Sequence, residues 1–102
     1  MLFCNEPVRQ RAQILAENMQ KWGRPEVVVT NSMPADYARS GLEFDVVLCD
    51  VPCSGEGMFR KDEGAIGEWS PQNVERCAAL QRQIVADAWQ CLRPGGLLIY
   101  ST

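Results

Sequence analysis

The sequence predicts an α/β protein built on a mostly parallel sheet. Short apolar segments rich in β-branched residues alternate along the chain with longer segments in which apolar residues recur every three or four positions. Strands that alternate with helices in this way form parallel sheets with right-handed crossovers. The 102 residues are enough for one small domain with a single core.

The N-terminal segment predicts a strand followed by a helix. Residues 1–5 are expected to form a short strand and residues 6–23 a helix. Pro7 suits the first helical turn, and Gly23 suits the position just past the last turn. The apolar residues of this helix form one stripe at spacings of three and four: Val8, Ala12, Leu15, Met19 and Trp22.

Two more strands follow before the middle of the chain. Residues 26–30 are β-branched and predict a strand. Residues 31–43 are expected to form a loop with room for one helical turn. Residues 44–49 predict a second apolar strand, too short for a helix and expected to be buried on both faces.

The C-terminal third predicts a helix and a last strand. Ser70 followed by Pro71 is typical of a helix start, with a hydroxyl cap before a residue that lacks an N–H group. Residues 93–96 are expected to end this helix, and residues 97–102 to form the strand. Its buried stripe is expected to contain Val74, Cys77, Ala78, Val85, Ala88 and Leu92.

Composition limits the classes of function. The net charge of −3 and the pI of about 4.9 argue against strong nucleic-acid binding by this chain alone, because phosphate affinity comes mainly from Lys and Arg. A site that receives nucleic acid held by another domain stays possible. Five cysteines without disulfide-framework spacing fit a reducing compartment. No signal peptide or membrane-spanning segment is visible, so we expect a cytoplasmic protein.

Candidate functional residues follow each predicted strand. In parallel sheets, ligands bind outside the carboxyl ends of the strands. Glu6 follows the first strand, Asn31 the second, residues 50–57 the third, and Ser101 lies at the end of the fourth. The convergence of four strand ends on one rim therefore predicts a binding site there.

An acid after the first strand suits a nucleoside cofactor. The carboxylate of Glu6 can accept hydrogen bonds from two ribose hydroxyl groups. The alternative is that Glu6 only complements the dipole of the following helix. Residue spacing does not decide between these two interpretations.

The segment DVPCSGEG, residues 50–57, is the densest candidate motif. Asp50 ends a strand expected to be buried, where a carboxylate is costly unless it has partners or a catalytic task. Pro52 stiffens the turn, and the thiol of Cys53 lies where a polar rim can lower its pKa. The spacing of phosphate-binding glycine loops is absent. The alternative is a tight loop with a buried structural cysteine.

Further residues near this motif have two interpretations each. Arg60 and Lys61 can bind RNA phosphates near the site, or form an ordinary solvated basic pair. Gln81 either hydrogen-bonds the loop after Asp50 or is a boundary residue of its helix. Cysteines alone, with no histidine and no C-x-x-C pair, give no metal site.

A resemblance makes the chemistry specific. The segment LCDVPCSGEGMFRKD (residues 48–62), followed by EWSP, LQRQIV and LRPGGLLIYST, closely resembles the Nop/Sun family of RNA cytosine-C5 methyltransferases. The nearest match is the bacterial branch that acts on 16S ribosomal RNA. The resemblance implies a Rossmann-like fold, S-adenosylmethionine as cofactor and ribosomal RNA as partner.

By this resemblance the candidate residues acquire roles. Glu6 matches the acid that binds the ribose of the cofactor. Asp50 matches the motif aspartate that contacts the target cytosine, and together with Pro52 it helps to shape the pocket for cytosine and the methyl donor. Cys53 matches the cysteine that assists release of the methylated product. The adenine-contacting aspartate of the family falls near Met33, and Asn31 or Asp36 is expected to substitute for it in part.

The resemblance also implies that the domain is partial. In this family the attacking cysteine directly follows a threonine that corresponds to Thr102, and a glycine-rich cofactor motif would precede Met1. The family strand order is 3-2-1-4-5, and this chain supplies strands 2 to 5 but not strand 1. We therefore expect residues 1–102 to be a partial catalytic domain, inactive and poorly stable without the missing N- and C-terminal parts of the same polypeptide.

Two rival functions stay open at this level. DNA cytosine-C5 methyltransferases use a proline-cysteine thiol as the nucleophile, a role that Cys53 would then take. The residues after Cys53 match the RNA pattern and lack the glutamine-bearing DNA pattern. The other rival is a non-catalytic remnant that binds a partner or a nucleoside.

Overall fold

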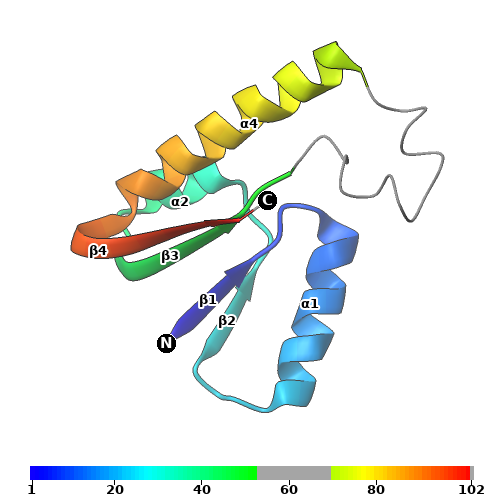
Figure 1. Ribbon diagram of the computed structural model, residues 1–102. Coiled ribbons are helices and arrows are strands. Elements are labelled where there is room, and N and C mark those ends of the chain that lie inside the picture. The colour runs from blue at the N-terminus through cyan, green and yellow to red at the C-terminus, as the bar shows by residue number, and fades with distance from the viewer. Residues whose placement is uncertain (53–69, 102) are drawn as a thin grey trace.

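The computed structural model describes residues 1–52 and 70–101 (Figure 1). Strands and helices alternate along these residues, as the sequence predicted. The elements in chain order are β1 (Leu2–Asn5), α1 (Arg9–Trp22), β2 (Val27–Thr30), α2 (Pro34–Ser40), β3 (Phe44–Asp50), α4 (Pro71–Gln90) and β4 (Leu92–Ser101). The expected α/β class is confirmed.

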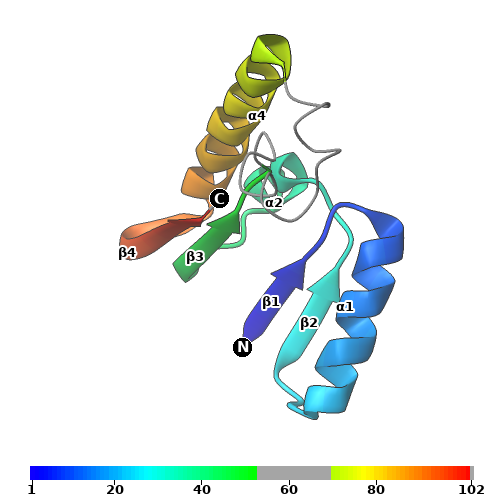
Figure 2. The same cartoon turned by 45° about the vertical axis from the view of Figure 1, so that its right-hand side comes forward.

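The strands form two parallel pairs. β1 pairs with β2 from Leu2↔Val27 to Asn5↔Thr30, and β3 pairs with β4 up to Asp50↔Ser101. The two pairs lie in one row in the order β2-β1-β3-β4, with their carboxyl ends at the same edge (Figures 1 and 2). Within the described residues, β1 and β3 share no ladder. This break lies where the resemblance predicted a missing strand.

Helices lie on both sides of the row of strands. α1 lies on one side, and α2 and α4 lie on the other (Figure 2). α2 packs on α4, and α4 packs on both β3 and β4. The rings of Phe3 in β1 and Phe44 in β3 meet edge to face at 5.2 Å between centroids, so the two strand pairs touch across the break.

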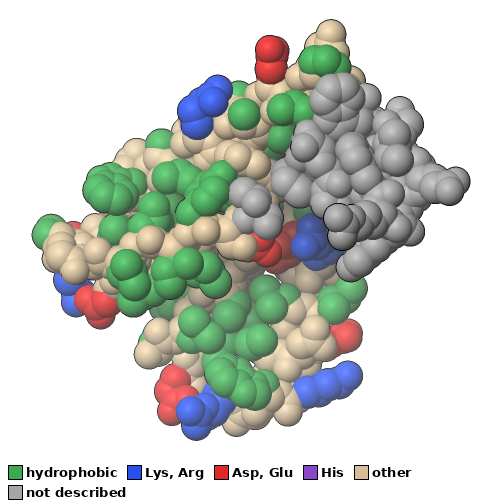
Figure 3. Space-filling view, viewed as in Figure 1, with side chains coloured by type: hydrophobic (Ala, Val, Ile, Leu, Met, Phe, Trp, Pro, Cys, Tyr) green, Lys and Arg blue, Asp and Glu red, His purple; other side chains and the backbone are tan. Residues whose placement is uncertain are grey.

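The core is small and lies on the α4 side of β3 and β4. It consists of Cys49, Val51 and Ala88, packed against partly buried apolar neighbours. The opposite face of the same strands is open, and its apolar side chains gather over β3 and β4 in Figure 3. The expectation that residues 44–49 are buried on both faces was therefore wrong. The open face is formed by Val46 (56% exposed), Leu48 (64%), Leu97 (57%) and Ile99 (43%).

The predicted helix ends are largely confirmed. Gly23 follows α1 with a φ of 77°, the left-handed conformation that glycine adopts at low cost. Pro7 precedes α1 instead of lying in its first turn. The hydroxyl of Ser70 accepts a hydrogen bond from the Asn73 N–H at 3.0 Å and caps α4. α4 ends at Gln90, before the Arg-Pro-Gly-Gly segment that was expected to stop it.

Two elements are longer than the sequence predicted. The expected loop 31–43 contains α2, a helix of 7 residues that starts with Pro34 and whose first turn is capped by Asp36. β4 begins at Leu92 instead of residue 97, with an irregular register before Val46. Position 96 requires a glycine, because a Cβ atom there would lie 2.7 Å from the Asp45 carbonyl oxygen of the paired strand.

Candidate functional site

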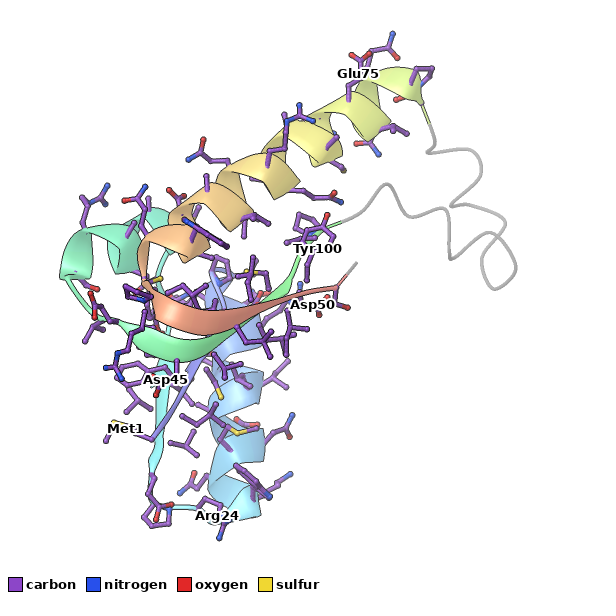
Figure 4. The ribbon with its side chains drawn as sticks, turned by 60° about the vertical axis from the view of Figure 1, so that its left-hand side comes forward. Met1, Arg24, Asp45, Asp50, Glu75 and Tyr100 are labelled. Atoms are coloured by element: carbon purple, nitrogen blue, oxygen red, sulfur yellow. The ribbon has the colours of Figure 1, made fainter. Side chains whose placement is uncertain are left out.

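The carboxyl ends of the strands bring the predicted site residues to one edge (Figures 1 and 4). Glu6 and Asn31 lie together after β1 and β2. Asp50 and Pro52 lie together with Ser101 at the ends of β3 and β4. The site therefore has two halves, one on each pair of strands.

Asn31 holds the main chain at Glu6. Its Nδ2 group donates to the carbonyl oxygens of Glu6 at 2.8 Å and Pro7 at 2.9 Å. The Glu6 N–H donates to the carbonyl of Thr30 at 3.1 Å. Asn31 thus fixes the turn between β1 and α1, which places the Glu6 side chain. Its own donor is engaged within the protein, so a direct contact of that donor with the cofactor would require a rearrangement.

The Glu6 carboxylate lines a shallow, open pocket. Glu6 is 20% exposed, and its Oε1 lies 3.4 Å from Nε of the exposed Arg11. Ile14, Leu15 and Asn18 of α1 complete the lining of a cavity of about 270 Å³. An ion pair with so exposed a partner is weak, and a ribose hydroxyl can compete for the carboxylate. The donor and acceptor chemistry fits the ribose of S-adenosylmethionine, while the cavity is small for the whole cofactor.

A side-chain network that sequence reasoning missed stiffens this half of the site. The Asn5 Oδ1 atom accepts from the Thr30 hydroxyl and from the Ser32 N–H, each at 2.9 Å, and its Nδ2 donates to the Ser32 carbonyl at 2.9 Å. The Thr30 hydroxyl also pairs with the Tyr37 hydroxyl of α2. Polar residues at two neighbouring strand ends were a visible signal for this network.

Asp36 is already engaged in the fold. Its Oδ2 accepts from the Met33 N–H at 2.9 Å, and its Oδ1 lies 2.6 Å from the Arg39 guanidinium. Both oxygens thus serve α2. The expected partial substitution of Asp36 for the adenine-contacting aspartate would need those contacts to change.

Asp50 closes β3 at the second half of the site. It is exposed, so the argument that its burial demanded a partner was wrong. Its main chain pairs with Ser101, and the next residue, Val51, is buried and donates its N–H to the Ser101 carbonyl at 2.9 Å. The carboxylate has no hydrogen-bond partner among the described residues, and Asp50 lies at the edge where β3 and β4 end (Figure 4).

Gln81 contacts the segment after Asp50, as one of its two sequence interpretations predicted. Its Nε2 group donates to the Pro52 carbonyl. Its Oε1 accepts from the Tyr100 hydroxyl at 2.7 Å. The residue lies in the middle of α4 and joins the ends of β3 and β4.

The remaining predicted residues, Cys53, Arg60 and Lys61, lie outside the described residues. Two other thiols in the described part are structural. Burial raises the pKa of Cys49, with a smaller contribution from the neighbouring Cys91, and burial also raises the pKa of Cys91. Such thiols stay protonated and make poor nucleophiles.

Two other kinds of site find no support in residues 1–52 and 70–101. No three Cys, Asp or Glu side chains gather there as a metal centre would require. No helix in the same ranges is both long and apolar enough to cross a bilayer.

Solved structures share the fold. The crystal structure of PH0851 superposes with a TM-score of 0.87 over 96% of this chain and 23% of that one, at 23% sequence identity. Identity at this level supports the shared fold and nothing finer. The partial Rossmann-like architecture of this chain is thus present within a larger protein.

Sequence relatives carry a common name. Ribosomal RNA small subunit methyltransferase F of Aeromonas hydrophila is 40% identical over 103 residues, which cover 100% of this chain and 22% of the relative. The protein of the same name from Escherichia coli O139:H28 is 39% identical and is covered to 21%. This chain therefore spans about a fifth of the length of these relatives. The family described as 16S rRNA methyltransferase RsmB/F matches residues 1–102, and the chain belongs to that family.

Proposed function

We propose that this chain forms part of the catalytic domain of an enzyme that methylates C5 of cytosine in 16S ribosomal RNA with S-adenosylmethionine. The observation that carries the proposal is the placement of Glu6 and Asp50 at one edge of the strands, in a chain of the RsmB/F family. One acid suits the cofactor, and the other suits the base.

Glu6 is proposed to hold the cofactor. Its carboxylate accepts hydrogen bonds from the two ribose hydroxyls, while Asn31 keeps the turn that carries it in place. S-adenosylmethionine supplies an electrophilic methyl group when bound. Further walls of the pocket must come from other parts of the polypeptide, because the described cavity is about 270 Å³.

Asp50 is proposed to act on the base. Cytosine C5 is a poor nucleophile until a thiolate adds to C6. A carboxyl group at the N3/N4 edge favours that addition by hydrogen bonding or proton transfer, and the exposed position of Asp50 permits this contact. The base must leave the RNA stack to reach the site.

The thiols have separate tasks in this proposal. The family resemblance implies that the attacking thiol is a cysteine outside residues 1–102. Cys53 assists expulsion of that thiolate once the C5 proton has left. Arg60 and Lys61 bind RNA phosphates close by, and a more basic part of the polypeptide supplies most of the RNA affinity, since this chain has a net charge of −3.

The test uses the full-length polypeptide that contains residues 1–102. Methyl transfer from S-adenosylmethionine to 16S ribosomal RNA is measured, and the modified nucleoside is identified by mass spectrometry. Glu6→Gln is expected to raise the cofactor Kd roughly 10- to 100-fold, as expected for loss of hydrogen bonds to a charged group. Asp50→Asn is expected to lower kcat much more than it raises that Kd. Glu17→Gln, an exposed acid of α1, is the matched control.

The Cys53→Ala variant separates the RNA layout from the DNA layout. Accumulation of a covalent RNA–protein adduct supports a releasing role for Cys53. Loss of all covalent attack supports Cys53 as the nucleophile and contradicts the proposal. Cofactor binding with no methyl transfer by the wild-type protein would instead support the non-catalytic remnant.

A further inference from the structure

We propose that Gln81 is a positioning residue that fixes the segment leading into Cys53 against the end of β4. The inference rests on the proposed function, because it assigns a task in methyl transfer to a helix residue outside the catalytic set. Its two partners, Pro52 and Tyr100, precede the two places where that function requires thiols.

The amide of Gln81 bridges segments that are distant in sequence. Pro52 lies 29 residues before Gln81, and Tyr100 lies 19 residues after it. The amide uses its NH₂ group on the Pro52 carbonyl and its oxygen on the Tyr100 hydroxyl. An uncharged side chain that donates and accepts at once is needed here, and glutamine meets this need at the observed reach.

Within residues 1–52 and 70–101, the ladder between β3 and β4 ends with a bond made by Val51. The Val51 N–H donates to the Ser101 carbonyl at 2.9 Å. Residues of β3 bond to β4 only at every second position, so the ladder bond of Val51 leaves Pro52 without a main-chain bond to β4. Its carbonyl is bound by Gln81 instead. Among the described residues, a side chain of α4 therefore holds the main chain just past the last ladder bond.

α4 provides a firm base for this contact. Gln81, Ile84 and Ala88 lie at i, i+3 and i+7 and thus share one face of the helix. Ile84 and Ala88 pack against Cys49 and other core residues. Gln81 is the half-buried residue where this stripe reaches the edge, and Figure 4 shows Tyr100 between the end of β4 and α4.

The contacts of Gln81 bear on the separation between the two thiols that the proposed function requires. Pro52 is bonded directly to Cys53, and Tyr100 is two residues before Thr102. Attack and release at one base require both segments to keep a fixed separation, and small displacements of reacting groups are costly in rate. Gln81 is therefore expected to act on the catalytic steps more than on cofactor affinity, since Glu6 lies on the other pair of strands.

The test compares three variants in the full-length polypeptide. Gln81→Glu keeps an acceptor for Tyr100 and sets an oxygen against the Pro52 carbonyl. Gln81→Met removes both contacts, and Tyr100→Phe removes one. Gln72→Glu, an exposed position in the first turn of α4, is the matched control. We expect kcat to fall about 10-fold or more for both Gln81 variants and less for Tyr100→Phe, with the Kd for S-adenosylmethionine unchanged.

Two readouts separate positioning from simple stability. In a Cys53→Ala background, Gln81→Met is expected to slow formation of the covalent RNA adduct at unchanged midpoint temperature of unfolding. Hydrogen exchange of the backbone amides of residues 47–51 and 97–101 is expected to rise in Gln81→Met and not in Gln72→Glu, and this readout is independent of activity. Unchanged exchange would overturn the inference, and so would unchanged kcat in an active enzyme. An inactive wild-type protein would count against the proposed function alone.

Discussion

The open face of β3 and β4 predicts that one substitution has opposite effects in the full-length protein and in residues 1–102 alone. Leu48 on this face is 64% exposed, whereas Val47 points to the opposite side and packs against the core with α4. If the rest of the polypeptide covers the open face, Leu48 is buried only in the full-length protein. Leu48→Ala should then destabilise the full-length protein and improve the behaviour of residues 1–102 expressed alone.

The magnitude follows from the exposed fraction. Burying a leucine side chain contributes about 1.5–3 kcal/mol, and about two thirds of the Leu48 surface is still open, so about 1–2 kcal/mol depends on the missing cover. The cavity left by truncation adds to this loss. In a domain of 150–250 residues this corresponds to a fall in midpoint temperature of about 2–8 °C.

The assay pairs thermal unfolding of the full-length protein with dye binding by the short chain. Leu48→Ala is expected to lower the midpoint temperature of the full-length protein. In residues 1–102 alone, the same change is expected to lower the fluorescence of a bound hydrophobic dye. Val47→Ala, the control from the neighbouring position, is expected to destabilise both forms. One result would refute the idea that this face is covered in the full-length protein. In that result, Leu48→Ala leaves the midpoint temperature of the full-length protein unchanged, whereas Val47→Ala lowers it.

Two further predictions concern stability. Ser70→Ala removes the acceptor for the Asn73 N–H and is expected to lower the free energy of unfolding of the full-length protein by about 1 kcal/mol. Ser70→Asp keeps an acceptor at the cap and is expected to retain that stability. Urea titration measures both variants, and equal losses would contradict the capping role. Burial raises the pKa of the Cys49 and Cys91 thiols, so this contribution to stability is complete below the unfolded thiol pKa of about 8.5 and is lost as the pH rises through the raised folded values. Replacing both cysteines with alanine should flatten the pH dependence of the free energy of unfolding above about pH 8.5. If that free energy falls as steeply in the variant as in the wild type, other groups cause the fall.

Local patterns predicted the elements well where one residue decides a boundary. Ser70 with Pro71 marked the start of α4, and Gly23 marked the end of α1, because capping and left-handed φ are local demands. α2 was underestimated, because its cap depends on Asp36, whose carboxylate also suited a binding role. The start of β4 was missed because Gly95 and Gly96 look like a stop signal, while long-range pairing of Leu92 with Phe44 decides the strand.

Burial was predicted less well than secondary structure. An apolar strand such as residues 44–49 indicates a sheet that is covered on both faces. The sequence pattern does not show whether residues 1–102 themselves cover each face. The same gap affected Asp50, which is exposed although its strand looked buried. The carboxyl-edge rule, by contrast, placed Glu6, Asn31 and Asp50 correctly at one edge, because it depends on topology and not on packing.

Side-chain hydrogen bonds hold each half of the site together, and the proposed methyl transfer depends on how the two halves lie relative to one another. Asn5 and Asn31 hold the Glu6 half, and Gln81 holds the Asp50 half. Between the halves, residues 1–52 and 70–101 provide the ring contact of Phe3 with Phe44 and the packing of α2 on α4, with no ladder from β1 to β3. Transfer of a methyl group needs donor and acceptor atoms placed within a fraction of an ångström. A strand inserted between β1 and β3 would therefore do more than complete the fold: it would set the distance between cofactor and base, and alignment of the halves should depend on it.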